Sequence, residues 1–194
     1  MLDLRKRDSW GNYREVRRYA TSSEINSYFC DHHQLLFWMA FVIAGTEEAA
    51  ESSIAEALED STHREGVFLE WLGNWAQFAV VRSAIAAIKE SIANSTRLYG
   101  SQSCGHGEHP GLSEAETLVL RTIEPRVVFT DLDPLARSVL IMRILRNTTI
   151  HDCVVALHVP GATVMAAYCG ALSWLRAQQS SYDALTGNLH LQAR

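Results

Sequence analysis

The sequence lacks every short motif that marks a common catalytic site. It contains no glycine-rich phosphate loop, no nucleophile elbow and no His-Glu-x-x-His. Its four cysteines, Cys30, Cys104, Cys153 and Cys169, form no Cys-x-x-Cys pair. We therefore expect reduced thiols in a cytoplasmic protein that is not an enzyme and holds no cofactor.

Long apolar runs are also missing. The longest, residues 34–45, is too short to span a bilayer and is typical of a buried helix. Residues 1–21 carry several cations but no apolar run behind them, which does not fit a signal peptide. The sequence therefore predicts no association with a membrane.

The sequence contains fewer basic than acidic residues. The 17 Lys and Arg residues are outnumbered by 22 Asp and Glu residues, so the formal net charge is -5. This balance argues against indiscriminate nucleic-acid binding, although it leaves room for a local basic patch.

What is present is helical periodicity. Residues 22–45 begin with Ser22, Ser23 and a nearby acid, and they end at Gly45, a plausible C-cap. Thr46 is expected to cap a helix over residues 46–60 that has glutamates in its first turn. Residues 67–92 are apolar nearly all round and predict one long central helix.

The second half repeats this pattern after a break rich in Ser, Gly and His. Ser113 is expected to cap a helix over residues 112–123, and Asp133 with Pro134 marks the start of the next. Residues 150–157 and 163–177 predict two further helices separated by a turn. The fold class is therefore all-α, with two small helical domains joined by a flexible linker and a helix-turn-helix in the second. The expected divisions are a basic extension at 1–21, a helical domain at 22–93, a linker at 94–112, the second domain at 113–180 and a tail at 181–194.

The expected linker also contains residue types that bind metals. Cys104, His106, Glu108 and His109 are crowded into one loop, and no second cysteine pair lies elsewhere to complete a tetrahedral site. We interpret the segment as a polar linker and expect no metal.

The order of the helices resembles a bacterial RNA polymerase sigma factor of the extracytoplasmic-function group. In the second half, residues in register with the family's pattern are Thr149, Ile150, Asp152, Leu157, Thr163, Val164, Ala171, Leu175 and Arg176. In the first half, residues 45–58 resemble the family segment that docks on core RNA polymerase. Residues 70–89 resemble the helix that melts and reads promoter DNA in the family.

The resemblance implies two sets of contact residues. The DNA-binding set is Trp71, Arg82, Thr149, His158, Gly161, Thr163, Val164, Met165, Ala167 and Arg176. The polymerase-binding set is Glu47, Glu48, Ala50, Glu51, Ser52 and Ala55.

The sequence departs from the family where DNA is read. Cations usually follow Thr163 and Val164, but here those places hold Met165, Ala166, Ala167, Gly170, Ala171 and Leu172. Each lost phosphate contact weakens DNA binding. In the first half, Ser52, Ala55 and Phe78 replace the usual Asp, Gln and Asn.

Two functions therefore stay open. One is a sigma-factor-like protein that binds core RNA polymerase and promoter DNA in transcription initiation. The other is a sigma fold that has lost DNA recognition and serves as a protein-binding regulatory module, as a competitor or with an anti-sigma-like partner. The apolar residues 165–169 suit either the core of a bundle or a surface for a partner protein.

Overall fold

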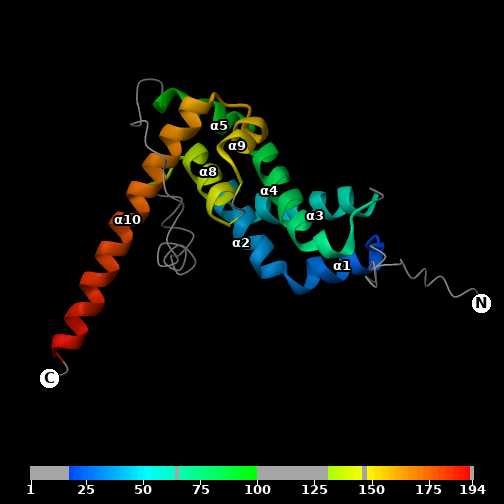
Figure 1. Cartoon of the computed structure of the whole chain (residues 1–194), viewed down its shortest axis with the longest axis horizontal. Helices are drawn as coiled ribbons and strands as arrows, with labels where there is room; N and C mark the ends of the chain where they lie inside the picture. Colours follow the sequence, from blue (N-terminus) through cyan, green and yellow to red (C-terminus); the bar gives the residue numbers. More distant parts are fainter. Residues whose placement is uncertain (1–17, 64–65, 100–130, 146–147, 193–194) are drawn as a thin grey trace, which may run out of the picture.

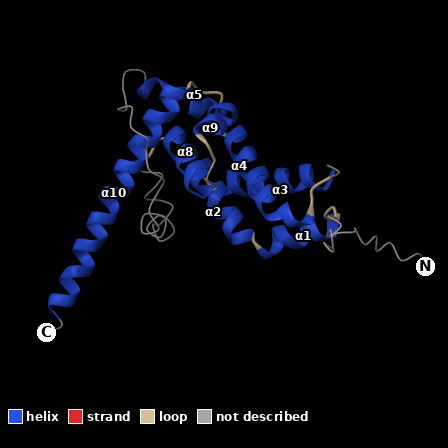
Figure 2. Ribbon diagram, in the orientation of Figure 1, coloured by secondary structure: helices blue, strands red, loops and turns tan. Residues whose placement is uncertain are grey.

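The computed structural model describes residues 18–63, 66–99, 131–145 and 148–192, and every structural statement below concerns these residues. They form eight α-helices and two short 3-10 helices, without any strand (Figures 1 and 2). The predicted all-α class is confirmed. Residues 1–17, most of the predicted linker and the helix expected over residues 112–123 lie outside the described residues.

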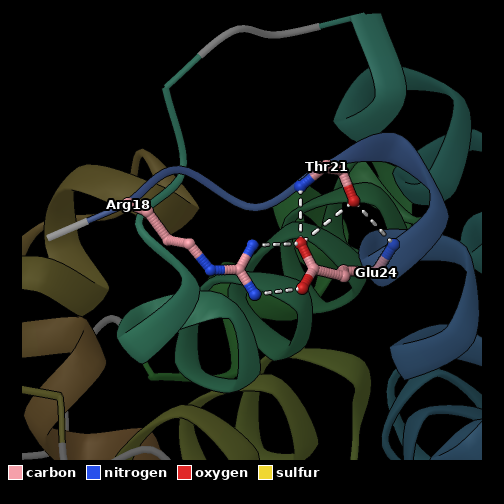
Figure 3. Close-up of polar contacts among 3 residues, drawn as sticks. All are labelled: Arg18, Thr21 and Glu24. Carbon is pink, nitrogen blue, oxygen red and sulfur yellow. Dashed lines mark hydrogen bonds and ion pairs between the residues drawn. The ribbon is translucent and has the colours of Figure 1, made fainter. Parts of the chain in front are cut away.

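The N-cap of helix α1 (Ser22–Asp31) lies one residue before the predicted position. Thr21, rather than Ser22, is the N-cap and forms a capping box with Glu24. The Arg18 guanidinium also donates to both carboxylate oxygens of Glu24, at 2.8 and 2.5 Å (Figure 3). The hydrogen bonds from Arg18, followed by those from Thr21, lower the pKa of Glu24 from 4.5 to about 2.

The prediction of one helix over residues 22–45 is wrong, because the chain bends at His32. This residue has φ -112° and ψ 14°, outside helical values, and α2 (His33–Ala44) follows it. Its ring Nδ1 lies 3.0 Å from the Tyr28 carbonyl oxygen, and the ring stacks on Tyr28 at 4.0 Å. Gly45 ends α2 with φ 88°, as predicted, because only glycine adopts this conformation without strain.

Helix α3 (Glu47–His63) starts as predicted, with the Thr46 hydroxyl accepting from the Ala49 N–H at 3.2 Å. The long helix expected over residues 67–92 is wrong. The chain instead forms η1 (Leu69–Trp71), α4 (Leu72–Ala87), α5 (Lys89–Ser95) and η2 (Thr96–Tyr99). The break falls at Ile88, and the redirected α5 buries Ile92 in the core.

Helix α8 (Pro134–Leu145) begins at the predicted Asp133–Pro134 signal. The Asp133 carboxylate accepts from the N–H groups of Leu135 at 2.9 Å and Ala136 at 3.2 Å. Helix α9 (Ile150–Leu157) has the predicted bounds. Helix α10 (Gly161–Gln192) starts two residues before the expected position and extends past residue 177, away from the other helices (Figure 1).

One hydrophobic core connects the two halves of the chain. Helix α2 packs against α3 and α4 and also against α8, while α8 packs against α10. The core includes Met39 and Ile43 of α2, Leu140 of α8 and Leu175 of α10, all of them fully buried. The apolar core is therefore continuous across the boundary expected between two domains, and the division itself stays a prediction.

A buried cation lies where α8 meets α2. Arg137 is only 7% exposed, and a guanidinium nitrogen is 3.6 Å from where a Cβ atom on Gly45 would lie. Burial lowers the pKa of Arg137, while the charge of Asp133 opposes that shift. The guanidinium thus sits near the carboxyl end of α2, where the helix dipole favours positive charge.

Candidate functional site

The helices α9 and α10 meet at an angle of 111° and are joined by three residues, His158, Val159 and Pro160. A capping box starts α9. The Thr149 hydroxyl accepts from the Asp152 N–H at 3.1 Å, and the Asp152 carboxylate accepts from the Thr149 N–H at 2.9 Å. Hydrogen bonds from the Thr149 side chain and backbone lower the pKa of Asp152. At the other end, His158 leaves the helix with φ 53°.

The apolar start of α10 is largely core. Val164 and Ala167 are 0% exposed, while Ala166 and Tyr168 are each 2% exposed. The Arg143 guanidinium lies 5.1 Å from the centre of the Tyr168 ring, which is a cation–π distance. Helix packing therefore removes both side chains from the surface, and the DNA contacts expected through Val164 and Ala167 stay predictions that their burial does not favour.

The other predicted DNA contacts on α9 and α10 have some exposure. Thr149, His158 and Arg176 are exposed, whereas Gly161, Thr163 and Met165 are half-buried. From Gly161 to Leu175, α10 contains no Lys or Arg. The pair of helices therefore presents Arg176 but no cation on the first turns of α10.

A different surface combines aromatic rings with a cation. Trp71 is 53% exposed and Phe78 is 41% exposed, and Arg82 is also exposed. Half-buried Trp75 lies between the two exposed rings in the sequence. Residues three and four positions apart share one side of a helix. Trp71 is the N-cap of α4 and the other three residues lie on the helix. We call this set, Trp71, Trp75, Phe78 and Arg82, the α4 stripe.

The aromatic surface continues beyond the start of α4. The Phe68 ring meets the Trp71 ring edge-on at 5.4 Å and stacks on Tyr19 at 4.6 Å. Tyr19 is itself 57% exposed. The family resemblance pointed to Trp71 and Arg82 but not to Trp75 or Tyr19. The three- and four-residue spacing could have identified Trp75, whereas no local pattern joins Tyr19 to α4.

Helix α3 lies against α4 and fixes part of the stripe. The Arg82 guanidinium donates to the Asp60 carboxylate at 2.7 Å, and the Ser83 hydroxyl donates to Glu56. Arg82 and Asp60 side chains are each 46% exposed. Arg82 is therefore already paired with a carboxylate of α3 when no partner is bound.

The predicted polymerase-binding residues also differ in exposure. Ala50 is 0% exposed, so its burial does not favour the expected contact through this residue, which stays a prediction. The remaining five, Glu47, Glu48, Glu51, Ser52 and Ala55, are exposed. Exposed Glu56 and Glu59 carry negative charge further along the helix, and Glu56 is turned toward α4, where it accepts from Ser83. We call Glu47, Glu48 and Glu51, which share one side of the first turns of α3, the α3 acidic face.

A small cleft brings together two predicted residues from opposite halves of the chain. It has a volume of about 200 Å³ and lies between the end of α4, the start of α5 and the end of α9. Arg82 and His158 both line it. The structure therefore places Arg82 and the α9–α10 turn around one cleft. Sequence spacing alone did not suggest this proximity.

The thiols differ from one another. Cys30 is an exposed free thiol and Cys153 is a buried one, but Cys169 is disulfide-bonded. The expectation of a reduced thiol at Cys169 is therefore wrong. Burial raises the pKa of the Cys153 thiol.

The described part of the chain shows neither a metal site nor a membrane-spanning helix. No group of three or more His, Cys, Asp or Glu side chains is placed to hold a metal ion there. No single helix in these ranges is long and apolar enough to cross a membrane. The bent pair formed by α9 and residues 161–178 reaches that length and apolarity only when both helices are taken together.

Comparisons with family models, curated proteins and solved structures give no significant match to this chain. The resemblance to sigma factors therefore depends on the residues themselves and stays a prediction.

Proposed function

We propose that the chain is a sigma-factor-like protein of transcription initiation. In this proposal the α3 acidic face binds core RNA polymerase, and the α4 stripe contacts promoter DNA. The observation that carries the proposal is the α4 stripe, in which exposed Trp71 and Phe78 precede exposed Arg82 at helical spacing.

The chemistry of the α4 stripe suits a melted strand better than a closed duplex. Unpaired bases stack on aromatic side chains, and each such contact contributes about 1–3 kcal/mol with little dependence on sequence. A cation beside the rings binds the phosphates that connect those bases. Trp71 and Phe78 provide exposed rings, and Arg82 provides the cation.

The α3 acidic face suits a basic protein surface. Its glutamates are exposed along one helix, and complementary charge guides association and sets the orientation of a complex. Because α3 packs against α4, both surfaces belong to one packed pair of helices. A polymerase bound to α3 would therefore hold the α4 stripe in a defined position.

The α9–α10 pair provides further support. Its angle of 111° falls within the range of about 90–120° that is typical of helix-turn-helix pairs. We propose that this pair is the helix-turn-helix of a second helical domain. Without cations on the first turns of α10, its affinity for duplex DNA is expected to be weak and to depend little on salt.

The burial of Val164 and Ala167 favours a second candidate function. A sigma fold with those positions in its core has lost two side chains that could reach DNA bases. Such a protein would bind polymerase through the α3 acidic face and act as a regulatory competitor or adaptor, without reading a promoter.

Association with purified core RNA polymerase tests the first half of the proposal. Glu47→Lys combined with Glu48→Lys is expected to weaken this association at least about tenfold, because two attractive charges become repulsive. Glu90→Lys combined with Asp31→Lys gives the same change in net charge at exposed positions outside α3. Equal weakening by both pairs, or no association by the unmodified chain, would reject polymerase binding through α3.

Binding of a fluorescent single-stranded oligonucleotide tests the second half. Trp71→Ala and Phe78→Ala are each expected to reduce affinity about fivefold or more through lost stacking. Leu98→Ala is the control, because Leu98 is a large apolar side chain that is 64% exposed on η2. Polymerase association without any DNA binding would favour the competitor or adaptor instead.

A further inference from the structure

The cleft between α4, α5 and α9 has an apolar floor and a cationic rim. Its floor contains Ile85, Ile92 and Leu157, which are 6%, 2% and 5% exposed. Three exposed side chains that carry or can accept positive charge surround this floor, and they are Arg82, Lys89 and His158. The rim residues come from three different helices or their ends.

The charge around the cleft contrasts with the rest of the chain. The formal net charge of the protein is -5, yet none of the described residues that line the cleft is acidic. Asp60, which does not line the cleft, pairs with Arg82, and Glu90 follows Lys89 along α5. Lys89 and His158 therefore provide most of the attraction that a negatively charged ligand would meet.

The size of the cleft limits what its floor can hold. At about 200 Å³ it is smaller than the roughly 300–1,000 Å³ of pockets that enclose small organic ligands. A single apolar side chain fits this volume better than a cofactor or metabolite. The remainder of such a ligand must extend over the rim, where the cations lie.

We propose that the cleft binds an acidic segment of a partner protein, which inserts one large aliphatic or aromatic side chain between α4 and α9. Carboxylates beside this anchor pair with Lys89 and His158, and with Arg82 at the edge. A buried apolar anchor within a charged rim is the usual arrangement of a protein-binding hot spot. The aliphatic floor distinguishes the cleft from the aromatic α4 stripe, because it offers no ring on which a base could stack.

The position of the cleft gives the interaction a consequence beyond polymerase and DNA binding. Arg82 belongs both to the rim and to the α4 stripe, so a segment bound in the cleft would cover the end of that stripe. The segment would also bridge the two halves of the chain, since His158 follows α9 whereas Lys89 begins α5. Neither effect requires that the chain bind polymerase.

Selection from a random peptide library displayed on phage tests the proposal directly, because the method needs no identified partner. Peptides selected on the full chain are expected to combine several Asp or Glu residues with one Leu, Ile, Phe or Trp. Their synthetic forms are expected to lose affinity at least about tenfold when the apolar residue becomes Ser, because the anchor's burial is lost.

Two variants test whether the selected peptides bind in the cleft. Lys89→Glu reverses a rim charge, and Ala86→Glu adds a negative charge at an exposed lining position. Each is expected to weaken the selected peptides at least about tenfold. A glutamate at the first position of α5 also suits the helix dipole, so Lys89→Glu should fold normally.

Arg97→Glu and Ala177→Glu are the matched controls, since both positions are exposed and neither lines the cleft. They are expected to leave peptide affinity within about twofold of the original, because distant surface charges are screened by salt. The proposal is overturned if no acidic peptides are selected, or if the controls weaken binding as much as the cleft variants. It is also overturned if only single-stranded DNA, and no peptide, responds to Lys89→Glu.

Discussion

The guanidinium of Arg82 on α4 lies 2.7 Å from the carboxylate of Asp60 on α3. The arginine expected to contact DNA is thus held by an acid of the neighbouring helix, which carries the proposed polymerase-binding face. Both side chains are 46% exposed, so the pair is accessible to solvent and to a competing phosphate. The ion pair connects the two surfaces on which the proposed function depends.

Asp60→Asn is expected to increase the affinity for single-stranded DNA, by about twofold to fivefold at low salt. The substitution removes one negative charge beside Arg82 and leaves its guanidinium available to a phosphate. Stability should change by less than about 1 kcal/mol, because exposed ion pairs contribute little. Fluorescence anisotropy and urea denaturation measure the two effects. Asp31→Asn on α1 is the charge-matched control, and an equal gain there would show that only net charge matters.

The stability of the protein is expected to fall in acid partly through Glu24. Its pKa is lowered to about 2 in the folded chain, so its contribution is present above its ordinary pKa of 4.5. That contribution is lost as the pH falls from about 4.5 to 2, where the unfolded chain binds the proton more readily. Thermal denaturation of the original chain and of Glu24→Gln at several pH values measures this loss. The difference between their melting temperatures should shrink below about pH 4, and a constant difference would contradict the assignment.

Thr149→Ala is expected to destabilise the protein by about 1 kcal/mol. The substitution removes the hydroxyl that caps α9 and also removes the hydrogen bond to Asp152. Ser27→Ala is the control, because its hydroxyl lies on α1 and donates only a long 3.4 Å hydrogen bond to Asp31. Urea denaturation of both variants gives the comparison. Equal effects would mean that the capping box does not stabilise α9 measurably.

Two glycines are expected to respond oppositely to alanine. Gly45 has φ 88°, so Gly45→Ala should cost about 1–2 kcal/mol in backbone strain. Gly170 lies within α10 with nothing within 4 Å of an added Cβ atom. Gly170→Ala should therefore stabilise the protein by up to about 1 kcal/mol through improved helix propensity. Chemical denaturation of both variants measures the two changes in the free energy of unfolding. A stabilising Gly45→Ala would contradict the left-handed conformation at the end of α2.

The sequence by itself determined where several helices begin and end. Thr46, Asp133 with Pro134, and Gly45 all occupy the predicted boundary positions. These signals are readable because a cap acts over about three residues, and a left-handed helix end needs a glycine within the same turn. The all-α class followed from the same local patterns, summed along the chain.

Only the tertiary structure decided which face each helix buries and which distant residues meet. The breaks at His32 and Ile88 interrupt runs that were apolar enough to continue as helices. Packing then removed Ala50, Val164 and Ala167 from the surface, although their positions within a motif suggested contacts. It also joined Arg82 to Asp60 on one side and placed it near His158 on the other. Such relationships depend on how helices from both halves fill one core, and no local pattern contains that information.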